Sequence, residues 1–264
     1  MGGTGRFLRY LFAAGFRRRS PKSSRTACPT SPVNPIRRSI SGSGLLPVLA
    51  ISLLSWGCAS APPDERPPVD AGQLAQQAEQ ASALDGSYRL VFEWTLNEPG
   101  VRVSGRGVAR LEGPYRARLD LFTSNGERIA AAALVNDDLR IPAGMPNIIP
   151  ASPMLWASLG VFRPGPGMAP SGATLDGAQR SQIRYRVAGG GELRADLLRR
   201  KVEHMELRGA DGARQEVRLN LPDGERFPRE AVYRHHGDVR ELRMVLEQVE
   251  HVETYPSDIW NPGA

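Results

Sequence analysis

Hydrophobic and polar residues alternate with a period of two through most of residues 88–249. In the first stretch, residues 88–96, the apolar side chains on one side of the alternation are Tyr88, Leu90, Phe92, Trp94 and Leu96. Successive side chains of a strand point to opposite faces, so this pattern predicts a half-buried strand. Similar patterns predict strands at residues 101–111, 115–121, 128–135, 139–142, 183–187, 193–197, 202–207, 215–221, 227–234 and 239–249.

Short turns separate these strands and indicate how they pair. Asn125-Gly126 is a strong hairpin signal. Parallel neighbours need long crossover connections, so such turns predict antiparallel pairing. Gly105 and Gly107 lie on the apolar side, where a missing side chain suits strong bending or close packing. We therefore expect one mainly β domain, in which an antiparallel sheet of about ten strands curls over its apolar face and exposes an arginine-rich face.

Two helices are predicted beside the strands. Residues 71–85 favour a helix that ends at Gly86 and has a weakly apolar face formed by Leu74, Ala78, Ala81 and Leu84. In residues 152–160, Ser152 suits the N-cap, Pro153 suits the first turn, and Gly160 suits the end. The second helix is apolar on most sides, which is typical of a buried helix, and it is the candidate cover of the sheet. The Pro/Gly-rich residues 163–172 after it predict a flexible loop.

The N-terminal segment has the pattern of an export signal. Arg37-Arg38 precedes an apolar run at residues 45–56, which is short of the roughly 20 residues of a membrane-spanning helix. A small residue followed by Cys58 resembles a bacterial lipobox, in which the cysteine sulfur takes a diacylglycerol after cleavage. An uncleaved anchor and a signal cut after Ala61 are the alternatives.

These features divide the chain into three parts. Residues 1–57 form the signal region, which is long enough to suggest that the gene model starts too early, and residues 58–70 form the lipidated cysteine and a Pro-rich tether. Residues 71–264 form the β domain. Cys28 lies in the signal region and Cys58 carries lipid, so we expect no disulfide and no thiol chemistry in the mature chain.

Charge excludes one large class of function. The formal net charge is +6, but nine of the 34 Lys and Arg residues lie in residues 1–57, which contain no acidic residue. Residues 58–264 therefore carry 25 basic and 28 acidic residues, a net charge of −3. A mildly acidic body lacks the basic footprint of a nucleic-acid-binding protein, so we expect no nucleic-acid partner.

The remaining residues carry little that indicates catalysis or metal binding. Common nucleophile, phosphate-loop and zinc motifs do not occur. His235-His236 would point to opposite faces of a strand, and Asp137-Asp138 falls in a turn. His204 and His251 each follow a glutamate in a polar strand, which predicts surface positions. We expect no catalytic residue, metal or cofactor, while an envelope enzyme remains a third possibility beside a carrier and a scaffold.

Several motifs together resemble one family. They are the lipobox, the short helix, Gly105-x-Gly107, Tyr115-x-x-x-Leu119-x-Leu121, Asn125-Gly126, Leu159-Gly160 and the late Leu221-Pro222. Over residues 86–262 this combination resembles the outer-membrane lipoprotein-receptor family LolB and its LolA-like relatives. The resemblance implies an unclosed β-barrel with a helical lid over a hydrophobic cavity that accepts acyl chains.

The resemblance also implies a site, partners and a location. The expected lining of the cavity is Phe92, Trp94, Leu119, Leu121, Met154, Leu155, Trp156 and Leu159. The expected partners are acyl chains or bacterial lipoproteins, the membrane through the lipid anchor, and a periplasmic carrier protein. The protein would face the periplasm from the outer membrane, where residues 145–149 are the nearest exposed-looking apolar loop for delivering lipoproteins. The alternative is a non-catalytic envelope scaffold with a filled core.

The anchor can be tested at one residue. Cys58→Ser should leave an unlipidated precursor of uncleaved size, because a serine hydroxyl cannot replace the thiolate as acyl acceptor. Membrane fractionation and the mass of the expressed full chain measure both effects. A variant that still partitions with membranes at the mature size would show that the lipobox interpretation is wrong.

Overall fold

The computed structural model of the protein describes residues 69–146, 148–177 and 179–263. The predicted signal region, Cys58 and most of the tether lie outside the described residues. Within the described ranges, no helix is both long and apolar enough to span a membrane.

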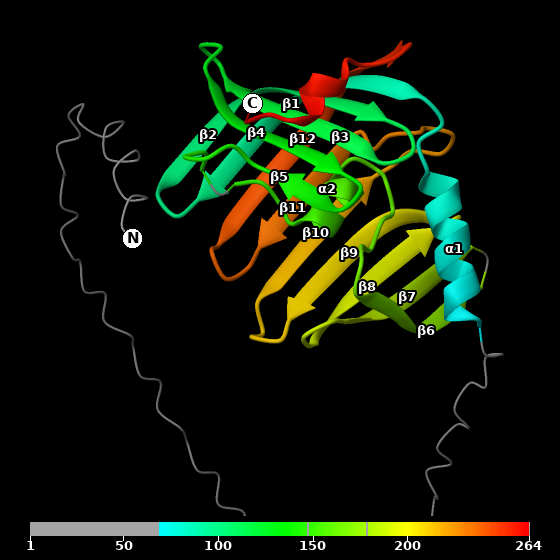
Figure 1. Ribbon diagram of the computed structural model, residues 1–264. Coiled ribbons are helices and arrows are strands. Elements are labelled where there is room, and N and C mark those ends of the chain that lie inside the picture. The colour runs from blue at the N-terminus through cyan, green and yellow to red at the C-terminus, as the bar shows by residue number, and fades with distance from the viewer. Residues whose placement is uncertain (1–68, 147, 178, 264) are drawn as a thin grey trace, which may run out of the picture. The chain divides into compact units, whose positions relative to one another are not determined.

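Twelve strands form one antiparallel, unclosed sheet (Figure 1), in the order β5-β4-β3-β2-β1-β12-β11-β10-β9-β8-β7-β6. The strands are β1 Ser87–Glu98, β2 Val101–Glu112, β3 Arg116–Thr123, β4 Arg128–Val135, β5 Asp138–Arg140, β6 Met168–Asp176, β7 Arg180–Val187, β8 Gly191–Leu198, β9 Lys201–Gly209, β10 Arg214–Asn220, β11 Glu230–His235 and β12 Arg240–Val252. The first and last strands pair at the middle of the sheet, and its two edges, β5 and β6, are consecutive in the chain. The mainly β fold and its antiparallel pairing are confirmed.

One strand contradicts the sequence prediction. Residues 163–172 were expected to form a flexible loop, but β6 begins at Met168 and pairs with β7. Its register with β7 shifts at Pro170, and none of the other described strands pairs with its free side. Proline is tolerated on an edge strand because its missing N–H need not break a ladder of hydrogen bonds. The sheet therefore has twelve strands rather than about ten.

Helix α1, Ala71–Ser82, packs against β6, β7 and β9. The carboxylate of Asp70 caps it by accepting hydrogen bonds from the backbone N–H groups of Gly72 and Gln73. Its buried residues are Leu74, Ala75, Ala78 and Ser82. Ala81, which was expected on the apolar face, is exposed, because the helix turns Ser82 rather than Ala81 toward the sheet. The helix also ends at Ser82, before the predicted stop at Gly86.

Helix α2, Ser152–Ser158, lies on the concave side of the sheet and packs against β9, β10 and β11 (Figure 1). Its N-cap is Ala151, so the expectation for Ser152 was wrong: the Ser152 hydroxyl instead donates to the carbonyl of Asp137. Pro153 is in the first turn, and Gly160, with φ of 79°, follows the end of the helix, as expected. A short 3-10 helix, η1 Ser257–Trp260, packs against β3 and β4.

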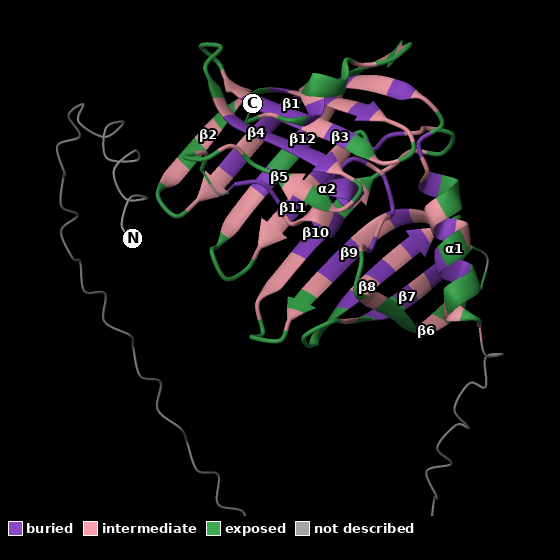
Figure 2. Ribbon diagram, viewed as in Figure 1, coloured by how far each residue is buried: buried purple, intermediate pink, exposed green. Residues whose placement is uncertain are grey.

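The hydrophobic core runs along the concave side. Figure 2 shows buried residues alternating with less buried ones along the strands and concentrated on α2. Small side chains recur among the buried positions of the sheet, including Ala109, Ala117, Ala130, Ala132 and Ala195. Small inward residues let the sheet curve tightly while larger neighbours fill the space that remains.

Two glycines of β2 permit a close approach on this side. A Cβ at Gly105 would lie 1.9 Å from the backbone oxygen of Phe122, and one at Gly107 would lie 2.3 Å from the Phe92 ring. Neither distance is possible between non-bonded atoms. At Gly105 the obstruction is the backbone of β3, so a side chain there would require the strands to shift, and at Gly107 it would require the Phe92 ring to move. The expectation of close packing at these glycines is confirmed.

Gly105→Ala tests this constraint. Because the obstructing atom belongs to the backbone of β3, the variant should lose about 1–3 kcal/mol of unfolding free energy, with local loss of β2–β3 pairing. Ser104→Ala, at an exposed position of the same strand, is the matched control and should be nearly neutral. Denaturant unfolding of both variants measures the difference, and equal stability would contradict the packing shown here.

Candidate hydrophobic binding site

The eight residues expected to line a cavity are brought together inside the curved sheet. Phe92 and Trp94 come from β1, Leu119 and Leu121 from β3, and Met154, Leu155, Trp156 and Leu159 from α2 and its end. All eight belong to one core cluster and are at most 3% exposed. The structure thus supports their position on the concave face, where they fill the interior.

Hydrogen bonds hold the two tryptophans in place. The Trp156 indole N–H donates to the carbonyl of Asn136 at 2.9 Å, which ties α2 to the turn between β4 and β5. The Trp94 indole N–H lies 3.1 Å from the carbonyl of Arg106 and 3.0 Å from that of Phe122. Both buried N–H groups are satisfied, so each ring is fixed at its polar edge while its remaining surface packs against apolar neighbours.

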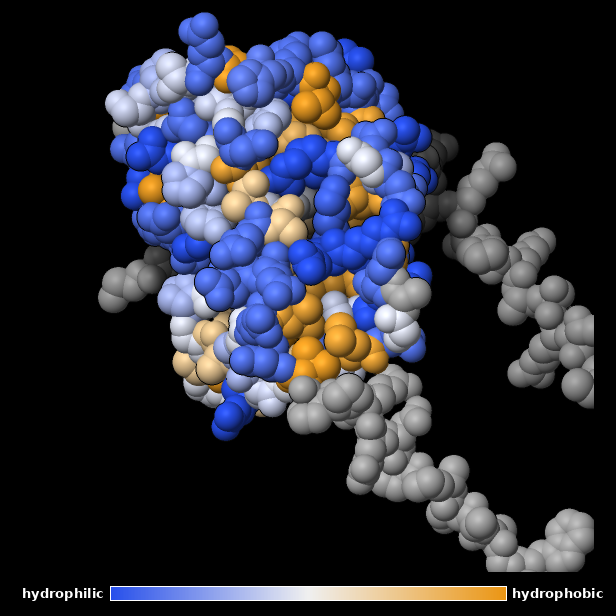
Figure 3. Space-filling model, turned by 90° about the vertical axis from the view of Figure 1, so that its right-hand side faces the viewer, coloured by the Kyte–Doolittle hydropathy of each residue, from blue (hydrophilic) through white to orange (hydrophobic). Residues whose placement is uncertain are grey.

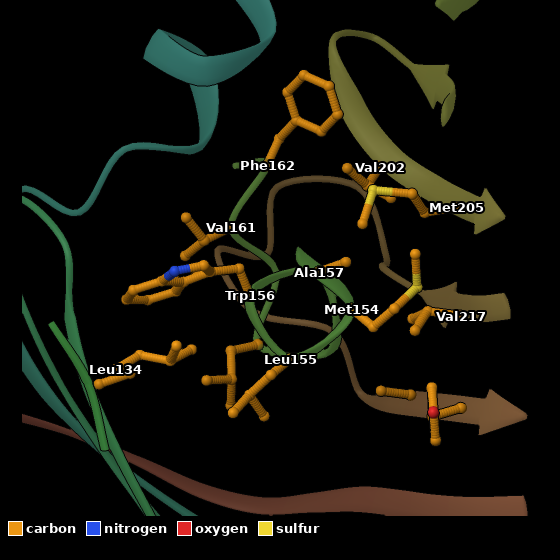
Figure 4. Packing of buried hydrophobic residues seen from close by; sticks show 14 of the residues in the cluster. Leu134, Met154, Leu155, Trp156, Ala157, Val161, Phe162, Val202, Met205 and Val217 are labelled. Carbon is orange, nitrogen blue, oxygen red and sulfur yellow. The ribbon is translucent and has the colours of Figure 1, made fainter. Parts of the chain in front are cut away.

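Several interior residues were not among the predicted site residues. Figure 4 shows the α2 side chains diverging, Trp156 toward Leu134 and Met154 toward Met205 and Val217. Leu134, Met205 and Val217 are fully buried. Each lies on a predicted strand, so the alternation of those strands carried a signal for burial, but nothing local indicated that they face α2.

The loop at residues 145–149 is exposed only in part: Pro146 is exposed and Met145 is half-buried, whereas the two isoleucines are buried. Ile148 is 5% exposed and Ile149 is 7% exposed, and both belong to the core cluster. The segment connects β5 to α2, and its isoleucines are buried as the chain passes from the sheet edge to the helix. It offers no exposed isoleucine for contact with a membrane.

A charged cluster lies on the outer face, where β9 and β10 pair. Glu206 and Glu216 are directly opposite each other in the register, and both are buried. Arg208 donates to Glu206 at 2.6 Å, and Arg214 bridges the two carboxylates at 2.9 and 3.2 Å. His204, predicted to lie on the surface, is only 16% exposed and contacts Asp196 at 2.9 Å. His204 lies between Asp196 and Glu216 and lines a pocket on the outer surface, so it is half-buried rather than part of the core.

The two carboxylates are held in their charged form. Burial tends to raise the pKa of Glu216, but the hydrogen bond from Arg234 and the charge of Arg218 bring the pKa below its ordinary value of 4.5. The pKa of Glu206 is lowered in the same way, against burial, by Arg208 and Arg214. These shifts describe an ion-pair network that stabilises the sheet.

The same cluster meets the distance requirement for a metal site. One ligand atom from each of His204, Glu206 and Glu216 lies within 4.8 Å of the others. However, Arg208, Arg214 and other arginines already neutralise the two carboxylates. A divalent cation would have to displace these ion pairs, so the residues present fit a structural role better than a metal centre.

Two surface pockets lie away from the hydrophobic interior. One, of about 440 Å³, is formed by the β1–β2 and β11–β12 turns and includes Pro99, His236 and Val239. The other, of about 540 Å³, lies over β7, β8 and β9 and includes Asp196, His204 and Arg218. Neither of these two pockets is lined by any of the eight predicted cavity residues.

Comparison with known proteins shows the fold. No family model matches the chain, and no curated protein sequence matches it. Among solved structures, it is similar to the LolA superfamily protein NE2245 from Nitrosomonas europaea, with 10% sequence identity and a TM-score of 0.50, over 73% of this chain and 98% of that one. The chain therefore has the fold of a LolA superfamily protein, as the sequence resemblance implied.

Two further structures were found with lower scores. A putative outer membrane lipoprotein-sorting protein domain from Vibrio parahaemolyticus has 9% identity and a TM-score of 0.41, over 73% of this chain and 98% of that one. A DUF1329 family protein from Desulfovibrio piger has 8% identity and a TM-score of 0.42, over 72% of this chain and 95% of that one.

The ion pairs around Glu206 and Glu216 on the outer face predict that the stability of the fold depends on pH. Glu216→Gln should lower the unfolding free energy at neutral pH by about 1–3 kcal/mol, because charged hydrogen bonds are lost. The folded-state pKa is lowered, so the carboxylate stabilises the fold above the ordinary value of 4.5, and this contribution disappears as the pH falls through the folded pKa. The difference in unfolding free energy between parent and variant should therefore disappear as the pH is lowered.

The matched control is Glu203→Gln. Glu203 pairs with Arg180 at 3.6 Å on the surface, so its variant should change stability by less than about 0.5 kcal/mol. Denaturant unfolding from neutral pH to about pH 3 measures both. If the difference in unfolding free energy between the parent and Glu216→Gln stays constant with pH, the carboxylate at this position does not stabilise the fold.

Proposed function

We propose that this chain is a lipid-anchored protein of the bacterial envelope that binds acyl chains, free or as part of lipoproteins, inside its curved sheet. The binding domain would be residues 71–264, and Cys58 would carry the anchor that holds it in the outer membrane, facing the periplasm. Its role would be LolB-like: accepting lipoproteins from a periplasmic carrier and helping to localise or insert them. The observation that carries the proposal is the continuous apolar concave face of an unclosed sheet, covered by α1 and α2.

The energetics of such binding need no catalytic group. Each methylene removed from water contributes about 0.8 kcal/mol, so the burial of an acyl chain offsets the cost of displacing packed side chains. Displacement is required, since the interior residues are almost fully buried. The displaced element would be α2. It lies in the segment from β5 to β6, which joins the two free edges of the sheet, so α2 can move without breaking a strand pair.

One observation favours a second function. Met154 and Trp156 are fully buried, and the α2 side chains contact apolar neighbours on several sides, as a permanently filled core requires (Figure 4). An envelope scaffold would use the same sheet without opening it. Native mass spectrometry of the full chain after mild extraction separates the two functions. Retained acyl adducts support the carrier, and their absence together with no uptake of an added acyl probe supports the scaffold.

The attachment of α2 provides a mutational test. Trp156→Phe removes the hydrogen bond to Asn136 but keeps an aromatic ring in the interior. It should cost about 1 kcal/mol of stability and speed the uptake of a fluorescent acyl probe, because α2 loses a tether to the sheet. Stopped-flow fluorescence and denaturant unfolding of the full chain measure the two effects.

Trp94→Phe is the matched control. It also removes hydrogen bonds made by a buried indole, but from a strand rather than from the covering helix. Its stability should fall, whereas its uptake rate should stay near that of the parent. Equal acceleration in both variants would indicate general loosening of the core and would contradict a specific opening at α2.

A further inference from the structure

A buried hydroxyl without a partner lies inside the apolar interior. Tyr185, on β7, is 2% exposed and belongs to the core cluster, and its Oη makes no hydrogen bond with the described residues. Its ring lies against Phe162, with centroids 6.2 Å apart. In contrast, the hydroxyl of Tyr233, another core tyrosine, donates to Gln215 at 2.9 Å.

An unpartnered hydroxyl is unfavourable in a filled core. Burial removes the hydrogen bonds that the phenol makes with water, and nothing among its described neighbours replaces them. Phenylalanine would fill nearly the same space without this cost. The hydroxyl is therefore explained most simply by a polar group that reaches it when the interior is occupied.

The surroundings restrict what that group can be. Burial, with a smaller contribution from the negative charge of Glu79 on α1, raises the pKa of Tyr185, so its hydroxyl stays protonated and can donate. An anion such as a free carboxylate would be costly to bury here, and Glu79 would repel it. A neutral acceptor, such as an ester or amide carbonyl, suits both the donor and the apolar walls.

Helix α1 covers the part of the interior where this group would lie, because it packs on β7, the strand that carries Tyr185. It contacts β6, β7 and β9, and of its four buried residues only Leu74 is large, the others being Ala75, Ala78 and Ser82. Figure 3, which views the side carrying α1, shows hydrophobic surface among mostly hydrophilic surface. Its C-terminal end is held more firmly: the backbone N–H of Phe162 donates to Ser82, and Arg226 donates to the Ser82 carbonyl.

We propose that Tyr185 is a specificity residue of the interior, whose hydroxyl donates a hydrogen bond to the ester or amide carbonyl that joins an acyl chain to its headgroup. This proposal rests on the proposed function, because it requires acyl ligands to enter the sheet. It adds a chemical preference that a purely apolar cavity would lack. Bare alkyl or ether-linked chains would bind by burial alone, and acyl-linked chains would bind more tightly.

A competition between two lipids tests the preference. The full chain, stripped of bound lipid, is mixed with equal amounts of a diester and a diether phosphatidylcholine of the same chain length, and native mass spectrometry counts the adducts. The parent should prefer the diester by about fivefold to tenfold, as one hydrogen bond predicts. Tyr185→Phe should bring the ratio close to one while diether binding stays within about twofold.

Tyr233→Phe is the matched control, and it should keep the diester preference because its hydroxyl already has a partner. Tyr185→Phe should melt at or above the temperature of the parent, since it removes an unsatisfied donor. Equal binding of both lipids by the parent would overturn the role of Tyr185 and leave acyl binding standing. Binding of neither lipid would overturn both proposals, and strong destabilisation by Tyr185→Phe would show that the hydroxyl has a partner within the fold.

Discussion

The pairing of β1 with β12 is the constraint on which the rest of the structure depends. It joins the beginning and the end of the strand meander at the middle of one sheet, with pairs from Ser87↔Val252 to Asn97↔Glu241 and one register shift between Val91 and Phe92. The two halves then grow outward, so the free edges, β5 and β6, are the two strands that are adjacent in the chain. The segment between them contains α2, which packs on the concave face. Without the central pairing, the halves would be two separate meanders with no common interior.

The two faces of this sheet satisfy opposite requirements. The concave face buries side chains against α1 and α2, and glycines and alanines there allow close approach to neighbouring strands. The outer face carries charged residues, and where Glu206 and Glu216 oppose each other, arginines from adjacent positions neutralise them. Cross-strand ion pairs let the outer face remain polar while the inner face holds the core together.

The function we propose depends on how far this interior can open. Side chains around α2 are packed as in any core, and both interior indoles have their hydrogen-bond partners. Near α1 the packing differs, because three of the four buried residues of the helix are small and the hydroxyl of Tyr185 has no partner among the described residues. The interior beneath α1 is therefore where the polar end of a ligand would gain a hydrogen bond once α2 has moved.

The sequence by itself determined the strands, because alternate burial is a local property: Tyr88 to Leu96 read as a strand before any partner was known. It also determined which side of each strand faces the core, and so placed Phe92, Trp94, Leu119 and Leu121 inside. It misjudged β6, whose Pro/Gly-rich stretch resembles a loop unless its position at an edge is known. Only the tertiary structure decided that Ile148 and Ile149 are buried, that His204 lies against Asp196, and that Tyr185 lacks a partner among the described residues. Each of these depends on contacts between residues far apart in the chain, which no local pattern of side chains encodes.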